Sequence, residues 1–159
     1  MGLFQKIFKL SKPINRRRLS GETVAALLRT ALHGRVTANY RHIGQKTQLA
    51  VTAREKIVQA SDRAFMPWLD GRWECENQAM AVVNEAQKIA ANEGCSWACG
   101  MLRGRRTEGM EDALHVWVWA LVEEDPKAMF PTAKLLLYDA TAREWDDLVD
   151  VKDIDYTLT

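Results

Sequence analysis

The period of the hydrophobic pattern changes at Gly94, and this change constrains the fold more than any other feature of the chain. In residues 74–94, apolar side chains recur at spacings of three and four, as on one face of a helix, and the glycine is a typical stop signal. Beyond it, apolar residues alternate or run together in residues 95–104, 113–124 and 132–140, which predicts three strands. Helices that precede a sheet predict an α+β fold, and short connections favour an antiparallel meander.

Two more helices are expected upstream of this change. Residues 22–33 carry one apolar stripe, with Ser20 or Gly21 as the N-cap and Gly34 as the stop signal. Residues 47–64 are partly periodic and predict a second helix. We therefore expect N-terminal helices, followed by a helix that packs on a small antiparallel sheet.

The first 20 residues differ from the rest of the chain. Residues 2–10 place apolar side chains at helical spacing with two lysines between them, which predicts a basic amphipathic N-terminal segment. Pro13 and Gly21 break periodic structure, so the stretch between them is interpreted as a linker. With 159 residues in all, the chain predicts a single domain over residues 21–159.

The net charge of +1 conceals an uneven distribution. Residues 1–60 hold twelve Lys and Arg against two acids, and residues 61–159 hold ten Lys and Arg against nineteen acids. Two hypotheses stay open: the two parts pack together and neutralise each other, or the basic part binds nucleic acid or another anionic partner. No phosphate-binding loop or recognition-helix signature accompanies the basic residues.

Composition and cysteine count favour a cytoplasmic protein. No apolar run approaches the roughly 20 residues that span a bilayer, so we expect no transmembrane segment. The N-terminal segment has lysines within its apolar part and no small-residue cleavage site, which makes it a poor secretory signal. The three cysteines cannot all pair within one chain, and we expect reduced thiols.

Cys75 is the candidate nucleophile. It stands where the most periodic helix begins, in the stretch "WECENQAM". Unpaired backbone N–H groups and the macrodipole stabilise an anion at a helix N-terminus, and a neighbouring imidazolium lowers the pKa of a thiol further. Taken alone, however, a cysteine is more simply interpreted as a small buried hydrophobe.

His115 and Asp139 are the candidate partners of this thiol. Among the three histidines, His33 lies at a helix end and His42 in a basic polar stretch, whereas His115 lies inside an apolar strand and needs a partner there. Asp139 closes the next predicted strand, so its carboxylate can reach the imidazole if the strands pair, and can fix its tautomer and orientation. The alternatives are a satisfied core histidine and a plain strand-end aspartate.

Taken in this order, the motifs resemble the transglutaminase-like branch of the papain-like cysteine enzymes. The matching stretches are "WECENQA", "EGCSWACGMLRG", "HVW" and "YDAT", within residues 68–145. The resemblance implies a transglutaminase-like core with Cys75 as nucleophile, His115 as base and Asp139 as orienting group. It also implies a cysteine protease or amidase that hydrolyses or transamidates the amide bond of a peptide or protein substrate. We expect no cofactor.

Trp73 and Trp117 are candidates for the oxyanion donor or for the wall of the cleft. Trp73 could supply its indole N–H, and Trp117 follows the candidate base by two residues on the same face of its strand. Residues 1–60 match no part of the family pattern.

Two alternatives to the enzyme remain open. One is a catalytically inactive binding module of the same fold, whose basic N-terminal half binds nucleic acid or an anionic partner. The other is a zinc site, which is less favoured because a Cys-x3-Cys spacing within a strand points poorly at one metal. Its ligands would be Cys75, Cys95, Cys99 and His115.

Overall fold

A computed structural model describes residues 18–32, 48–65, 74–106, 114–123, 133–148 and 151–158 of the chain. The elements, in chain order, are β1 (Arg18–Ser20), α1 (Gly21–Ala31), β2 (Gln48–Ala50), α2 (Arg54–Ala64), α3 (Cys75–Asn92), β3 (Cys99–Arg106), β4 (Leu114–Glu123), β5 (Ala133–Asp139), β6 (Glu144–Asp146) and β7 (Val151–Leu158). The predicted α+β class is confirmed. The basic segment expected at residues 2–10 lies outside the described residues.

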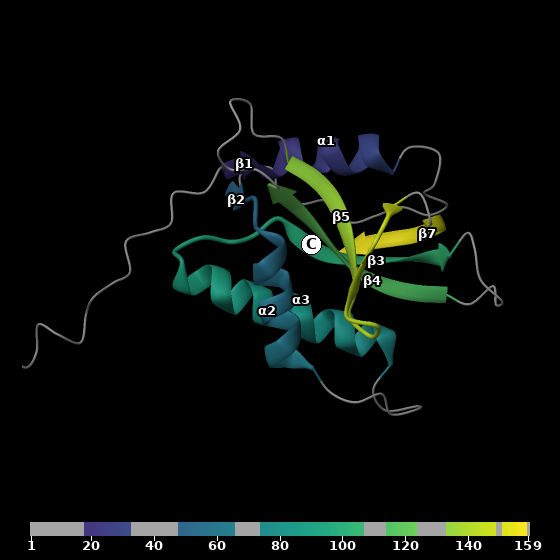
Figure 1. The fold of residues 1–159 in the computed structure, drawn as a ribbon. Coiled ribbons are helices and arrows are strands. Elements are labelled where there is room, and N and C mark those ends of the chain that lie inside the picture. The colour runs from purple at the N-terminus through teal and green to yellow at the C-terminus, as the bar shows by residue number, and fades with distance from the viewer. Residues whose placement is uncertain are drawn as a thin grey trace, which may run out of the picture.

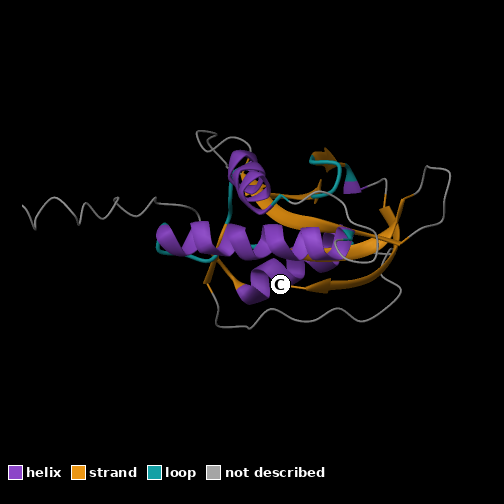
Figure 2. Ribbon diagram, turned by 90° about the horizontal axis from the view of Figure 1, so that it is seen from below, coloured by secondary structure: helices purple, strands orange, loops and turns teal. Residues whose placement is uncertain are grey.

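A five-stranded antiparallel sheet, in the order β6-β5-β4-β3-β7, forms the middle layer of the fold. Helix α1 covers one face, and α2 and α3 cover the other (Figures 1 and 2). Because successive side chains of a strand point to opposite faces, the central strand β4 serves both cores. Val116 and Val118 pack with α2 and α3, whereas Trp117 and Trp119 pack with α1.

Helix α3 confirms the strongest prediction from the sequence. Its apolar stripe packs against the sheet through Ala79, Val82 and Ala86, which are all buried. The helix ends at Asn92, and Gly94 then takes a φ of 72°, a left-handed conformation that favours glycine. The chain therefore turns back onto the sheet where the period of the sequence changes.

The helix expected over residues 47–64 is wrong in its first part. Residues 48–50 form strand β2 instead, which pairs with β1. The backbone of Ala50 accepts a hydrogen bond from Ala98 and donates one to Ser96, so tertiary pairing decides the conformation of this segment. Strand β1 also gives Arg18–Ser20 a regular structure where the sequence indicated a linker.

Strand β7 closes the far edge of the sheet and was not expected from the acidic end of the sequence. It pairs with β3, and its register shifts between Arg103 and Arg105. Gly104 lies at this shift, where an added Cβ would be 2.9 Å from the carbonyl oxygen of Lys152. A glycine is therefore needed for the two strands to approach.

In the part of the chain that the structure describes, no helix is long and apolar enough to cross a membrane.

Candidate thiol site

The site lies where β4 continues past the end of β5. The ladder between the two strands ends at Val118 and Tyr138, so the first residues of β4 extend beyond it. One of these, Val116, donates its backbone N–H to the sulfur of Cys75, the first residue of α3. The start of a helix on one face of the sheet thus meets, at one thiol, the part of the central strand that pairs with β3 but no longer with β5.

His115 joins this thiol to a buried carboxylate. Its ring contacts Cys75, and its Nε2 lies 2.9 Å from Oδ2 of Asp139. The other carboxylate oxygen, Oδ1, accepts the backbone N–H groups of Thr141 at 2.8 Å and Ala142 at 3.0 Å. The turn after β5 therefore fixes the carboxylate, and the carboxylate in turn fixes the imidazole.

The electrostatics of the site favour a thiolate and a protonated imidazole. Burial raises the pKa of the Cys75 thiol, but the hydrogen bonds and charge of its surroundings, led by His115, hold the pKa below its usual 9.0. Burial lowers the pKa of His115, yet the contacts with Asp139 and Cys75 raise it to about 9. The pKa of Asp139 is lowered: burial raises it, but the contact with His115 and the backbone N–H groups of Ala142 and Thr141 together outweigh that effect. The three predicted residues therefore form one electrostatic unit.

Two residues that sequence reasoning missed complete the network. Arg106 donates from Nη2 to Oδ2 of Asp139 at 2.6 Å, and the same nitrogen lies 3.0 Å from Oδ2 of Asp146. Its Nη1 donates to Oδ1 of Asp146 at 3.2 Å. The indole Nε1 of Trp117 donates to Oδ2 of Asp146 at 2.6 Å. One guanidinium thus bridges two carboxylates.

The alternation of side chains along β3 indicates the position of Arg106. The strand expected over residues 95–104 is observed at Cys99–Arg106, so it includes Arg106. Leu102 and Gly104 pair with Trp117 and His115, so alternation places Arg106 on the same face of the sheet as these residues. Asp146 carried no comparable signal, because its strand β6 is only three residues long.

The two tryptophan candidates have different outcomes. Trp73 lies outside the described residues. Trp117 is in the site, where its ring meets that of His115 edge-on at 4.6 Å. Its N–H is engaged by Asp146, however, so it is not the oxyanion donor. Among the described residues, backbone N–H groups of Val116 on β4 and of Glu76 at the start of α3 donate to the thiol.

The other two cysteines are structural. Cys99 is buried, which raises the pKa of its thiol to about 12, and its sulfur accepts a hydrogen bond from Gln87. The thiol of Cys95 donates to the carbonyl oxygen of Ala90. None of the three cysteines forms a disulfide bond, and the described residues include no cluster of three or more groups arranged to hold a metal ion.

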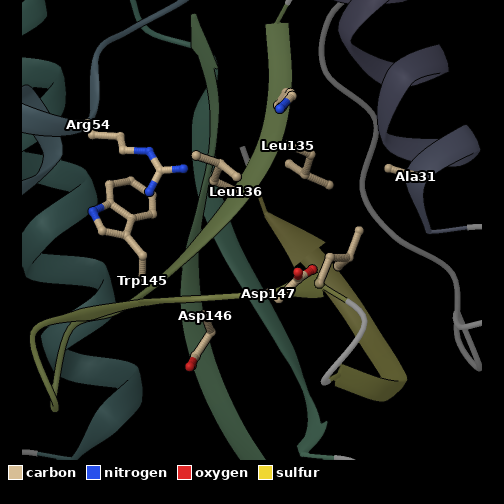
Figure 3. Close-up of a pocket in the computed structure, with 9 residues that line it drawn as sticks. Ala31, Arg54, Leu135, Leu136, Trp145, Asp146 and Asp147 are labelled. Carbon is tan, nitrogen blue, oxygen red and sulfur yellow. The ribbon is translucent and has the colours of Figure 1, made fainter. Parts of the chain in front are cut away.

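A pocket of about 570 Å³ borders this network on the side of β6. Asp146 belongs both to its lining and to the Arg106 bridge. The guanidinium of Arg54 lies over the ring of Trp145, 5.4 Å from its centroid, and Asp147 lies across the pocket from them (Figure 3). The pocket therefore offers an aromatic group and charges of both signs.

Comparisons with known proteins give a fold likeness only. No protein-family model matches the chain, and no curated protein matches it in sequence. A structure of Polyporus squamosus lectin, bound to the human-type influenza-binding epitope Neu5Aca2-6Galb1-4GlcNAc, is similar with a TM-score of 0.66 and 17% identity, over 89% of this chain and 49% of that chain. The "PSL1a-E64 complex" is similar with a TM-score of 0.64 and 18% identity, over 89% and 50%. The chain thus spans about half the length of these proteins.

This likeness corrects the function expected from the sequence. We expected a cysteine-dependent acyl-transfer enzyme, whereas the similar solved structure with a named source is a lectin, a binding protein. The expectation rested on four short motifs, which specify where a thiol, an imidazole and a carboxylate lie but not what the protein does with them.

Proposed function

We propose that the protein is a binding protein that holds its ligand beside a reactive thiol. The observation that carries this proposal is the arrangement of Cys75 at a helix N-terminus, His115 on β4 beyond its ladder with β5, and Asp139 behind the imidazole. The likeness to a lectin supports the binding part. The lowered pKa of Cys75 supports the reactive part, because the thiolate is the nucleophilic form of cysteine.

The imidazolium has two roles in this proposal. It stabilises the thiolate before the ligand arrives, and it can donate its proton to an oxygen atom that becomes negative when the sulfur adds to a neighbouring carbon. Asp139 stays ionised throughout and keeps the ring in place. A ligand with an electrophilic carbon next to an oxygen atom matches this chemistry.

Alkylation by iodoacetamide tests the proposal, with peptide mass spectrometry as the readout between pH 5 and 10. In this reaction the sulfur forms a bond to the CH₂ carbon, and iodide leaves with the electron pair of the C–I bond. We expect Cys75 to reach its maximal rate at a pH well below that of a free thiol, whose pKa is about 8.5. Cys95 is the matched control, since it is half-buried like Cys75 but its thiol donates to the carbonyl oxygen of Ala90.

The variant His115→Ala gives the second arm of this experiment. Without the imidazolium, we expect the midpoint of Cys75 labelling to rise by at least about one pH unit, because a neighbouring opposite charge lowers a pKa by about 1–3 units. Slow labelling of Cys75 in the wild type, or an unchanged midpoint in the variant, would reject a reactive thiol.

Several finer statements belong to the same proposal. A transglutaminase-like core is supported by a helix that starts at Cys75 and packs on strands carrying His115 and Asp139. Turnover of a ligand by a cysteine-dependent enzyme stays a prediction, which release of more than one equivalent of product would test. A reducing, cytoplasmic setting fits three unpaired cysteines. An anionic partner for the basic residues of positions 1–60 stays a prediction, since most of them lie outside the described residues.

Carbohydrate is a second candidate ligand, for which the pocket beside β6 is the specific observation. Trp145 provides an aromatic group, and Arg54 and Asp147 provide charged hydrogen-bonding groups of the kind that orient a polar ligand. Titration with the trisaccharide Neu5Acα2-6Galβ1-4GlcNAc, followed by ¹H–¹⁵N NMR, tests it. We expect shifts at the Trp145 indole and a loss of at least about tenfold in affinity in Trp145→Ala; an unchanged spectrum of the wild type would reject this trisaccharide as the ligand.

A further inference from the structure

Asp139 and Asp146 come close to each other through a single cation. Asp139 ends β5 and Asp146 ends β6, and Nη2 of Arg106 contacts Oδ2 of both, at 2.6 and 3.0 Å. The side chain of Asp139 is 3% exposed and that of Asp146 is 13% exposed. Two carboxylates this well shielded from water repel each other strongly unless a positive charge lies between them.

We propose that Arg106 is a positioning residue of the thiol site: its guanidinium bridges the two carboxylates and offsets the charge of Asp146, so that His115 faces the net charge of one carboxylate rather than two. This inference rests on the proposed reactive thiol, whose behaviour Arg106 would adjust without touching the ligand. Arginine suits the task because its planar fork contacts two carboxylates at once and keeps its charge at every relevant pH.

The geometry separates this role from that of simply fixing the position of Asp139. Oδ1 of Asp139 is already bound by the backbone N–H groups of Thr141 and Ala142, so the carboxylate stays oriented without Arg106. Asp146 likewise accepts a hydrogen bond from the indole N–H of Trp117, which does not depend on Arg106. Loss of the guanidinium would therefore change the charge of the site more than its shape.

Among the described residues, charged groups from several elements surround Asp139. His115 reaches it from β4, Arg106 from β3 and Asp146 from β6, with Cys75 of α3 on the far side of the imidazole. Glu144, the ladder partner of Asp139, is exposed and contributes little. Asp139, Asp146 and the Cys75 thiolate carry three negative charges, and the His115 imidazolium and Arg106 carry two positive ones. The site therefore has a net charge of one negative, and removal of Arg106 makes it two.

The test compares the full-length wild type with Arg106→Gln, Asp146→Asn and the double variant. Two midpoints are measured: the pH of half-maximal iodoacetamide labelling of Cys75, and the imidazole pKa of His115 by NMR. In Arg106→Gln we expect both to rise, that of His115 by about one unit, because an uncompensated negative charge disfavours thiolate and favours imidazolium. In the double variant both should return to within about 0.3 units of the wild type, since one positive and one negative charge are then removed together.

A merely structural role gives a different pattern. If Arg106→Gln loosened the site, His115 would lose Asp139 and its pKa would fall toward 6.5, and Asp146→Asn would not rescue it. That pattern, or unchanged midpoints in Arg106→Gln, would overturn the proposal. Arg106→Lys is the conservative variant, because it keeps the positive charge but lacks the planar guanidinium that contacts both carboxylates. We expect the pKa of His115 in this variant to stay close to its wild-type value.

The same data separate the two proposals. Slow labelling of wild-type Cys75 at every pH would reject the reactive thiol, and the His115 titration would still decide the role of Arg106. Normal labelling in the wild type with no rescue in the double variant would reject the role of Arg106 alone.

Discussion

Nε2 of His115 lies 2.9 Å from Oδ2 of Asp139, and these two residues come from neighbouring strands whose ladder has already ended at Val118 and Tyr138. The contact is therefore made by side chains beyond the ladder between β4 and β5, while His115 still pairs with β3 and Asp139 with β6. It places an imidazole whose pKa is raised to about 9 at the start of helix α3, where Cys75 lies. A buried carboxylate, an imidazole and a thiol in this order can hold a thiolate at neutral pH.

The first prediction concerns the pKa of His115. In Asp139→Asn, we expect this pKa to fall from about 9 by at least one unit, because the raised value depends first on contact with Asp139. NMR titration of the imidazole gives the value directly. Asp62→Asn is the matched control, since it removes a carboxylate that pairs with Arg143 at the surface, and it should leave the His115 titration where it is.

The second prediction concerns the free energy of unfolding of Asp139→Asn as a function of pH. The pKa of Asp139 is lowered in the folded chain, so this residue contributes stability above its usual value of 3.8, which is lost as the pH falls through the folded value. Asp139→Asn should therefore cost about 1–3 kcal/mol at pH 7 and progressively less below pH 4. Urea unfolding at pH 7, 5 and 3 measures this; a cost that grew toward pH 3 would contradict the assignment.

How far the sequence predicts this molecule depends on where each signal lies. Helix α3 and strands β3, β4 and β5 have long periodic patterns, and all four were expected close to their observed bounds. Cys75, His115 and Asp139 were found because each stands at a chemically unusual place in those patterns. Whether they meet was a question of strand register, which the structure answers.

The misses share a physical cause. Strand β2 exists because Ala50 exchanges backbone hydrogen bonds with Ser96 and Ala98, and no local pattern reports a partner so distant in the chain. The bridge between Arg106 and Asp146 joins β3 to β6 across two other strands. In the sequence alone, Arg106 and Asp146 are indistinguishable from ordinary surface charges, because their proximity depends on the order of the strands.

A third prediction concerns the close approach of β3 and β7. Gly104→Ala should destabilise the fold by about 1–3 kcal/mol, because its Cβ would lie 2.9 Å both from the carbonyl oxygen of Lys152 and from a methyl group of Val151. Gly94→Ala is the control, since nothing lies within 4 Å of its added Cβ and the cost comes only from its φ of 72°. That cost is about 1 kcal/mol. Chemical denaturation of both variants measures the two costs. Equal costs would mean that β7 shifts to make room for the added Cβ without lowering the free energy of unfolding.

Gly104 also pairs with His115 in the ladder between β3 and β4. We expect Gly104→Ala, but not Gly94→Ala, to disturb the NMR signals of the His115 ring. An undisturbed ring would show that the strain is absorbed entirely by β7.

The last prediction tests the bond between the indole of Trp117 and Asp146. Trp117→Phe should cost about 1–3 kcal/mol, since it leaves a void in a fully buried position and removes a hydrogen bond to a charged group. In an Asp146→Asn background the cost should be smaller by at least about 0.5 kcal/mol, because the charge that strengthens the bond is gone. Asp147→Asn is the matched control, as it removes the neighbouring carboxylate without touching this bond. Urea unfolding of the wild type, Trp117→Phe, the two aspartate variants and the two double variants gives both couplings. Equal coupling to Asp146 and Asp147 would show that packing alone holds Trp117.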